Sequence, residues 1–348
     1  MTASEWPRVV TFGEMLLRFS ASDESRLFES GDMRAGFGGA EANVAVALSH
    51  LDVWCEYVTR LPDNLIGDAA MDVLREEGVQ LTHVLRGPER MGLYFVEPGA
   101  DVANARVVYD RAGSAFASLV PAMLDWPAVL GNAQWFHGTG ITAALGEGPV
   151  ATLGAGIAAA QELGIPVSID LNYRPALWRG RDPAPLVTPL LHGIDLLIAN
   201  PHSARAMLGI AVADNVLATT EGALGLAMQL TAQFGCRQVA LTRREITGPS
   251  GNRWSAMLYD AEAGTLTASR PWTVRVIDRI GSGDSFAAAL IASLLHHRTP
   301  RDAIEFAVAA SALKLRVPGD FNRVKTVDVE KLVRGMDAAG ARAGELWA

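Results

Sequence analysis

The sequence has few cysteines and no excess of positive charge, and both scarcities exclude classes of protein. Its 348 residues include two cysteines, Cys55 and Cys236, which cannot build a disulfide framework and lack metal-ligand spacing. Both lie in apolar, strand-like runs, so we expect buried structural thiols rather than catalytic ones. The formal net charge of −8 argues against a nucleic-acid partner and against binding to an anionic membrane surface.

Long apolar runs, repeats and low-complexity segments are also missing from the sequence. No uninterrupted apolar run reaches the roughly 18 residues of a membrane helix, and the N-terminal stretch 1–7 has neither the basic nor the apolar region of a signal peptide. We therefore expect a cytoplasmic protein without a membrane partner. No linker is rich enough in small polar residues to divide the chain, so a single domain over 1–348 is predicted.

Strand-like and helix-like segments alternate regularly from residue 134 onward. Apolar strand patterns at 134–137, 166–170, 196–200 and 238–242 are separated by helical patterns such as 147–163 and 223–234. This order is typical of an α/β fold with a doubly wound, mostly parallel sheet. Shorter alternating strands near 15–34 and 91–111 predict a small inserted β-sheet, a lid that covers a cleft and excludes water.

A glycine turn at 277–286 precedes a helix of small residues and carries the main candidate for chemistry. Gly281 and Gly283 lack Cβ atoms, so the backbone can approach a ligand closely. The N-terminus of the following helix suits a phosphate or an oxyanion, and Asp284 places a possible general base beside it. This combination suits phosphoryl transfer. The same string is also a good loop and helix cap, so the local pattern alone leaves both interpretations open.

A second glycine turn, at 35–43, leads directly into another helix. Gly39 again permits close approach to a ligand, and Asn43 lies in the first turn of the helix, where its amide can contact hydroxyl groups. Polar residues also follow the predicted parallel strands, namely Asp170 to Asn172, Asn200 and Thr242. Because ligands of such folds bind outside the carboxyl ends of the strands, we expect these residues and the 281–284 turn to converge on one site.

The two glycine motifs together identify a family resemblance over residues 8–335. Gly38-Gly39-Ala40-Glu41-Ala42-Asn43 and Gly281-Ser282-Gly283-Asp284 resemble the ribokinase (PfkB) family of sugar kinases. Within that family the chain is most similar to the 2-keto-3-deoxygluconate kinases. The strings that carry this similarity are Gly92 to Tyr94, Tyr109 to Ala115, Asp170 to Trp178 and Asp278 to Phe286.

The resemblance implies a ribokinase-like fold and transfer of the γ-phosphoryl group of ATP to the terminal hydroxyl of a sugar acid. Asp284 resembles the catalytic base of the family, and the backbone of Gly281, Ser282 and Gly283 its anion hole. The implied substrate contacts are Gly39, Asn43, Tyr94, Tyr109, Arg111 and Arg174. The implied nucleotide contacts are Asn172, Asn200, Thr242, Arg243 and Asn322, together with Gly281 and Gly283.

The chain departs from the family pattern at three places, of which the first two concern the metal and the nucleotide. Many members carry Asn-x-x-Glu where this chain has Asn200-Pro201-His202-Ser203, and the loop after Thr242 lacks the usual glycines. Ser282 stands where alanine is more usual. No His, Cys and carboxylate cluster has metal-ligand spacing, so we expect any Mg²⁺ to arrive with ATP and to keep several of its waters.

The choice of substrate rests on arginine. The planar guanidinium binds carboxylates through two parallel hydrogen bonds, so Arg111 and Arg174 favour a sugar acid over a neutral sugar. They do not separate the gluconate-derived acid from its galactonate epimer. Fructose and ribose kinases remain alternatives, as does a sugar-acid sensor without turnover, which the intact Asp284 turn opposes. An exposed lid sheet also suggests a homodimer through the lid.

Overall fold

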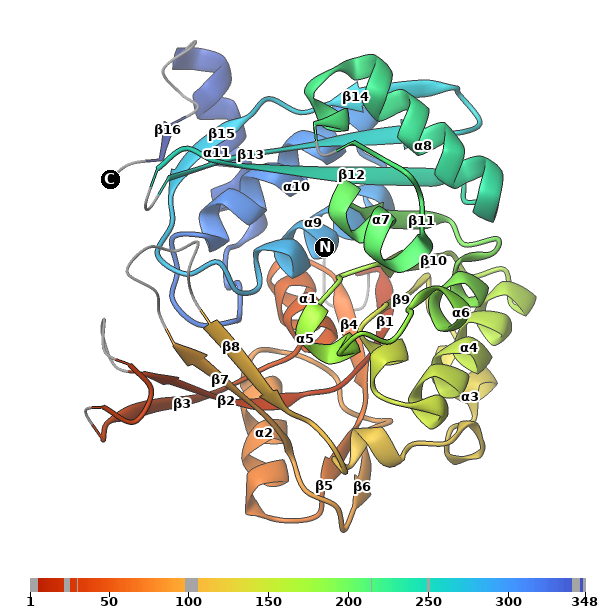
Figure 1. Cartoon of the computed structure of the whole chain (residues 1–348), viewed down its shortest axis with the longest axis vertical. Coiled ribbons are helices and arrows are strands. Elements are labelled where there is room, and N and C mark those ends of the chain that lie inside the picture. Colours follow the sequence, from red (N-terminus) through yellow and green to blue (C-terminus); the bar gives the residue numbers. More distant parts are fainter. Residues whose placement is uncertain are drawn as a thin grey trace.

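A ten-stranded sheet runs through the centre of the molecule (Figure 1). The structure is a computed structural model and describes residues 6–21, 26–29, 31–97, 106–213, 215–248, 251–339 and 345–346. Neighbouring strands follow the order β16-β15-β13-β12-β11-β10-β9-β1-β4, with β14 paired to β13. The strands from β4 to β12 along this order are parallel, and β13 runs antiparallel to its neighbours. Their bounds are β1 (Arg8–Phe12), β4 (Trp54–Val58), β9 (Trp135–Thr139), β10 (Val167–Asp170), β11 (Leu196–Ala199), β12 (Gln238–Ile246), β13 (Gly251–Asp260), β14 (Thr265–Ala268), β15 (Trp272–Arg275) and β16 (Glu345–Leu346).

Helices cover both faces of this sheet. Consecutive strand residues point to opposite sides, and both sides of the sheet are apolar. Val9 and Val10 of β1 belong to two separate apolar clusters, as do Leu196 and Leu197 of β11. One cluster contains residues of α1 (Ala40–His50), α2 (Leu65–Glu76), α9 (Ser282–Leu295), α10 (Pro300–Lys314) and α11 (Thr326–Ala339). The other contains residues of α3 (Trp126–Leu130), α4 (Glu147–Glu162), α5 (Pro175–Trp178), α6 (Ala184–Val187), α7 (Pro201–Leu208) and α8 (Thr220–Phe234).

A separate four-stranded sheet, which we call the lid, lies beside the carboxyl ends of the parallel strands (Figure 1). Its order is β3-β2-β7-β8, built from β2 (Leu16–Ala21), β3 (Met33–Gly38), β7 (Gly92–Glu97) and β8 (Arg106–Asp110). Alternate residues of β7, including Tyr94 and Val96, are buried, so one face of the lid is turned inward. A short parallel pair, β5 (Arg60–Pro62) with β6 (Leu85–Gly87), lies nearby in the chain.

The expected α/β architecture with a small inserted sheet is confirmed, and the errors lie in individual elements. Strand β3 continues to Gly38, beyond the lid segment predicted to end near residue 34. The glycines of this segment indicate a turn in the sequence. Residues 186–193 have a helical pattern in the sequence, but the structure has the end of α6 followed by a 3₁₀ turn at Thr188–Leu191, since Pro189 cannot continue the α-helical hydrogen bonding. Across the described part of the chain, no helix combines the length and apolarity that a bilayer crossing requires.

Candidate active site

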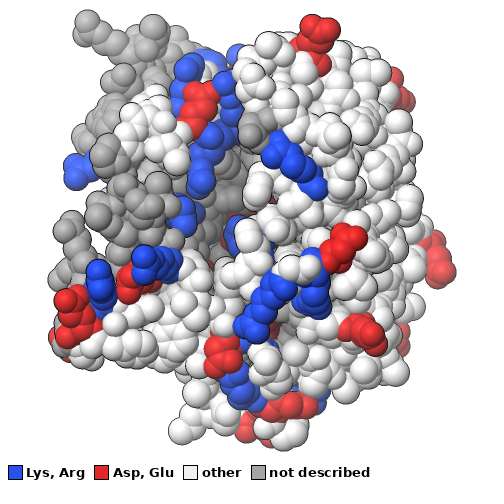
Figure 2. Space-filling model, in the orientation of Figure 1, with Lys and Arg blue, Asp and Glu red and all other residues white. Residues whose placement is uncertain are grey.

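A cavity of about 900 Å³ opens where the carboxyl ends of the parallel strands meet the lid. Figure 2 shows a hollow on this face of the molecule, with basic side chains around it. The cavity is lined by three groups of residues, which are lid residues, strand-end residues and the glycine turn that precedes α9. They include Tyr94, Val107 and Tyr109 from the lid, Asp170, Asn172, Asn200 and Thr242 from the strand ends, and Gly281, Ser282, Gly283 and Asp284 from the turn. The expected convergence of these segments is therefore present.

The glycine turn begins α9 and lines the cavity. Gly281 has a φ of +80°, and a Cβ at this position would lie 2.1 Å from the carbonyl oxygen of Asp320, so only glycine fits. A Cβ on Gly283 would meet no atom within 4 Å, which marks the open side of the turn. The first N–H groups of a helix have no partner within it, so the turn offers donors and a partial positive charge to an anion.

Asp284 lies in the first turn of α9 with 4% of its surface exposed. Its carboxylate accepts hydrogen bonds from the side-chain amide of Asn43 at 2.7 Å and from that of Asn172 at 3.1 Å. Burial raises the pKa of Asp284, and the two amides and the charge of Arg174 act in the opposite direction. The result is a fixed carboxylate that is a stronger base than an exposed aspartate.

A second carboxylate, Asp170, lies at the end of β10 on the same cavity. Its burial, followed by the negative charge of Asp284, raises the pKa of Asp170 to about 7. The backbone N–H of Asn172 donates to Asp170 Oδ1 at 2.9 Å, and Asn172 has a φ of +43°. Asn172 thus bridges the two acids, because its side-chain amide also donates to Asp170 Oδ2 at 3.3 Å.

Oxygen donors at the strand ends fit a magnesium ion that keeps several of its waters. Asp170 and Asn200 both line the cavity, and carboxylate and carbonyl oxygens are the ligands that Mg²⁺ prefers. Within the described ranges, no group of three His, Cys, Asp or Glu side chains is arranged to hold a metal by itself. Asn200 forms a capping box with Ser203, which donates its backbone N–H to Asn200 Oδ1 at 2.9 Å. The serine that stands in place of the common glutamate therefore completes the cap at the start of α7.

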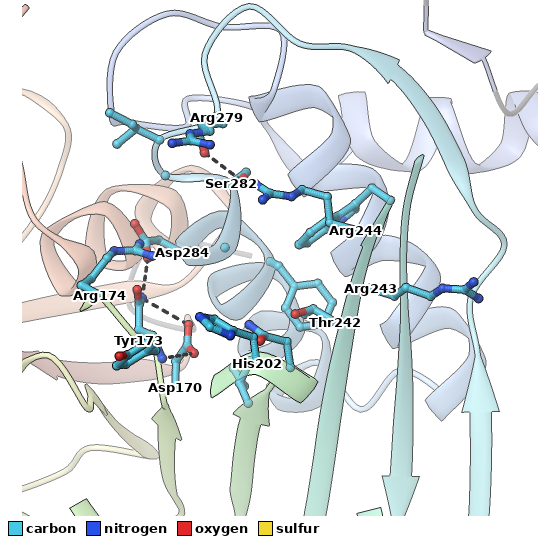
Figure 3. Close-up of a pocket in the computed structure, with 18 of the residues that line it drawn as sticks. Asp170, Tyr173, Arg174, His202, Thr242, Arg243, Arg244, Arg279, Ser282 and Asp284 are labelled. Carbon is cyan, nitrogen blue, oxygen red and sulfur yellow. Dashed lines mark hydrogen bonds between the residues drawn. The ribbon is translucent and has the colours of Figure 1, made fainter. Parts of the chain in front are cut away.

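Three arginines line the cavity near the glycine turn, Arg174, Arg244 and Arg279. In Figure 3, Arg244 extends from β12 toward Ser282, and Arg174 lies beside Asp284. Burial lowers the pKa of Arg244, and the positive charges of Arg279 and Arg174 lower it further. Burial and Arg174 have the same effect on the pKa of Arg279. Like charges gathered in one cavity indicate an anionic ligand.

The sequence prediction included Arg243 and missed Arg244, its neighbour on β12. Side chains alternate along a strand, so Arg244 shares the face of Thr242, and Arg243 faces the other way. Arg243 lines the rim of the cavity, but its guanidinium is ion-paired with Glu245 and points away from Asp284 (Figure 3). The parity of positions 242 and 244 was the signal in the sequence that could have identified Arg244.

Two tyrosines from the lid complete the wall opposite the strands. The rings of Tyr94 and Tyr109 are stacked, with their centroids 6.2 Å apart. The hydroxyl of Tyr94 donates to Asp320 Oδ1 at 2.6 Å, which connects the lid to the loop after α10. Stacked rings with one fixed hydroxyl form a flat wall suited to a small polar ligand.

Four of the residues predicted for the site do not line the cavity, Gly39, Asn43, Arg111 and Asn322. Asn43 contacts Asp284 directly, as described above. Gly39 caps α1, where a Cβ would lie 2.3 Å from the carbonyl oxygen of Glu14. The amide of Asn322 is buried and donates to Ser285 Oγ at 2.5 Å, so it contacts the helix that carries Asp284.

Arg111 is held behind the tyrosine wall. Its Nε donates to Glu14 Oε2 at 2.5 Å, and the two side chains are 8% and 1% exposed. Its guanidinium also lies over the ring of Tyr109, 5.9 Å from the centroid. The buried Glu14 needs a positive partner. This pairing could not be predicted locally, because the two residues are 97 positions apart in the chain.

This fold and this site define a class of phosphoryl-transfer enzymes, and comparison with known proteins agrees. Residues 7–326 match the model of the pfkB family of carbohydrate kinases, and the chain belongs to that family. It is therefore a phosphotransferase that acts on a carbohydrate hydroxyl group, which confirms the predicted family and enzyme class. Kinases of this family use ATP.

Three similar proteins are named as kinases of sugar acids. The 2-dehydro-3-deoxygalactonokinase of Haloferax volcanii is 31% identical over 330 residues, which is 95% of this chain and 98% of the relative. The 2-dehydro-3-deoxygluconokinase of Thermoproteus tenax is 28% identical and covers 90% and 89% of the two chains. The crystal structure of 2-dehydro-3-deoxygluconokinase from Thermotoga maritima is 38% identical, with a TM-score of 0.90 over 95% of this chain and 99% of the other.

Proposed function

We propose that this protein transfers the γ-phosphoryl group of ATP to the terminal hydroxyl of 2-keto-3-deoxygluconate, also called 2-dehydro-3-deoxygluconate. The observation that carries the proposal is the position of Asp284. Its buried carboxylate lies beside the open glycine turn, with the tyrosine wall of the lid on one side and the strand ends on the other. A base and an anion-binding turn on the same cavity are what in-line phosphoryl transfer requires.

In this mechanism the strand-end side of the cavity receives the nucleotide, and the lid side receives the sugar acid. Thr242 lies toward the triphosphate, and Asp170 and Asn200 would hold Mg²⁺ through oxygen atoms and waters. The ion, when bound with ATP, supplies positive charge to the phosphates. Asp284 takes the proton of the terminal hydroxyl as that oxygen attacks the γ-phosphorus. The amides of Gly281, Ser282 and Gly283 stabilise the charge on the transferred group.

The arginines support an acidic substrate. Arg174 lines the cavity beside Asp284 (Figure 3) and has no acidic partner within hydrogen-bonding range among the described residues, and Arg279 lines the same cavity. We assign the carboxylate of the sugar acid to Arg174, with Arg279 as its neighbour. Arg111 contributes through Tyr109, since its Nε is already bonded to Glu14. Arg244, on the strand-end side, is assigned to the phosphates.

Replacing Arg174 with alanine is expected to raise KM for the sugar acid by about 10- to 100-fold, because hydrogen bonds between charged groups contribute about 1.5–3 kcal/mol. The KM for ATP should change by less than about threefold. Steady-state ADP release, with each substrate varied in turn, measures both constants. Arg111→Ala tests the indirect contact in the same assay. Equal changes in the two KM values would contradict the assignment of Arg174 to the carboxylate.

A substrate panel tests the proposed function as a whole. ADP release with Mg-ATP is measured against 2-keto-3-deoxygluconate, its galactonate epimer, fructose, ribose and adenosine. Turnover confined to the two keto acids supports the arginine assignment, and the ratio of kcat/KM for the two acids decides the preferred epimer. Preference for a neutral sugar would discard the carboxylate site. Thermal stabilisation by an acid without turnover would favour a sugar-acid sensor.

The pH dependence of turnover should follow the raised pKa of Asp284. Only the ionised carboxylate accepts the proton, so kcat/KM for the sugar acid falls as the pH drops through the pKa of Asp284. Because burial raises this pKa, the acid limb should lie above the range of an exposed aspartate, about pH 4. Arg174→Ala removes a positive charge that lowers the pKa, so it should move the limb to higher pH. A limb at about pH 4 in both proteins would contradict this prediction.

A further inference from the structure

Lys314 is the last residue of α10 and is fully buried, with 0% of its surface exposed. Its ammonium donates a hydrogen bond to the carbonyl oxygen of Val317 at 2.9 Å. Burial lowers the pKa of Lys314, and the negative charges of Asp278 and Asp320 oppose this effect. Burying an ammonium is costly unless nearby negative charge compensates it. A lysine in this position therefore calls for a reason beyond packing.

The side chain of Lys314 lies directly under the anion-binding turn. A Cβ on Gly281 would be 3.3 Å from Lys314 Cε, so the aliphatic stem packs against the residue that starts the turn. The surrounding backbone is tied to the same helix end. The amide of Ile277 donates to the carbonyl of Leu315 at 2.8 Å, and Ser311 Oγ donates to the carbonyl of Ser282 at 2.7 Å. Both ends of the turn are thus hydrogen-bonded to residues at the end of α10.

Lys314 adds a buried positive charge close to two carboxylates beside the turn, Asp278 and Asp320. Asp278 precedes the turn, and its Oδ2 accepts the amide of Gly319 at 3.0 Å. Asp320 contacts the turn from the other side. Arg18, from the lid, pairs with Asp278 at 3.0 Å and with Asp320 at 2.8 Å. The two carboxylates place negative charge beside a site that binds a phosphoryl group, and Arg18 and the neighbouring Arg279 offset part of it. The ammonium of Lys314 adds positive charge from the side of the turn where its stem packs against Gly281.

We propose that Lys314 is a positioning residue for phosphoryl transfer. It is an internal cation that stabilises the conformation of the 281–284 turn and adds positive charge near the site of the transferred group. The inference rests on the proposed phosphoryl-transfer function. Lys314 reaches the reaction through the turn and touches neither substrate. Its loss should therefore lower kcat at saturating substrate, and the KM for the sugar acid, which binds on the lid side, should change little.

Two substitutions distinguish this role from a purely structural one, in which Lys314 only stabilises the fold. Lys314→Gln keeps an N–H donor for the carbonyl of Val317 and most of the side-chain volume, but it removes the charge. Lys314→Met removes both the charge and the hydrogen bond. We expect Lys314→Gln to recover part of the melting temperature lost in Lys314→Met, with kcat still at least about tenfold below the wild type. The matched control is Lys325→Gln, because Lys325 is exposed and lies outside the cavity.

The measurements are ADP release with Mg-ATP and 2-keto-3-deoxygluconate, and thermal unfolding followed by circular dichroism. Lys314→Gln with wild-type kcat would overturn the proposal, whatever its melting temperature, since turnover would then not need the charge. A tenfold loss of kcat in Lys325→Gln would also overturn it. If Lys314→Met does not fold, Lys314→Gln alone decides the question. Failure of the proposed function itself is distinct, because the wild type would then show no turnover with any substrate of the panel.

Discussion

Replacing Asp284 with asparagine is expected to lower kcat by about 10²- to 10⁴-fold, the usual contribution of a general base. The amide has nearly the same shape as the carboxylate but cannot take the proton of the attacking hydroxyl. The fold should tolerate the change. Asp284 accepts hydrogen bonds from Asn43 and Asn172, and Asn43 Oδ1 is buried without a hydrogen-bond partner. A flip of the Asn43 amide would let that oxygen accept a bond from the new amide.

ADP release at saturating ATP and sugar acid measures this effect, and circular dichroism checks that the variant is folded. Asp110→Asn is the matched control. Asp110 lies on the lid strand β8, is exposed and pairs with Arg90, so its loss should change kcat by less than about twofold. Turnover of Asp284→Asn within a factor of three of the wild type would remove the assignment of Asp284 as the base. A variant that loses its near-ultraviolet dichroism would instead show that the carboxylate is needed for folding.

The parts of the site that could be predicted from the sequence are those set by local backbone structure. The Gly281 to Asp284 turn and the ends of β10 and β11 depend on short-range rules, on glycine conformation and on where a parallel strand stops. These rules place Asn172 and Asn200 on the cavity, where the structure has them. The same local rules set the order of strands and helices, and so the fold class.

The parts that could not be predicted depend on partners that are distant in the sequence. Arg111 has the side-chain chemistry of a carboxylate ligand, but its Nε donates to the buried Glu14. Asn322 belongs to a family pattern, yet its amide bonds to Ser285. Lys314 ends an ordinary helix, and only the fold shows that it is buried where the charges of Asp278 and Asp320 act on it. Charge alone does not say whether a residue meets a ligand or a side chain of its own chain.

The lid is joined to the body by a second long-range contact, centred on Arg18 of β2. Its Nη1 donates to Asp320 Oδ1 at 2.8 Å, and its Nη2 donates to Asp278 Oδ2 at 3.0 Å. The side chains of Arg18 and Asp320 are 10% and 3% exposed. Asp320 Oδ1 also accepts from Tyr94, so two lid strands meet the same carboxylate. Removing the guanidinium would leave these buried acids with too little positive charge.

Arg18→Met is therefore expected to lower the free energy of unfolding by about 3–5 kcal/mol, the cost of breaking a buried ion pair from one side. Methionine keeps an apolar stem of similar length, so the loss reports the charge more than the volume. Urea unfolding followed by tryptophan fluorescence measures it. In the control, Arg90→Met, a partly exposed arginine next to the lid loses its ion pair with Asp110, and the expected loss is at most about 1 kcal/mol. Equal losses in the two variants would mean that the Arg18 contact does not hold the lid. A large loss for Arg18→Met alone, accompanied by a raised KM for the sugar acid, would mean that the contact stabilising the fold also keeps Tyr94 in place on the cavity wall.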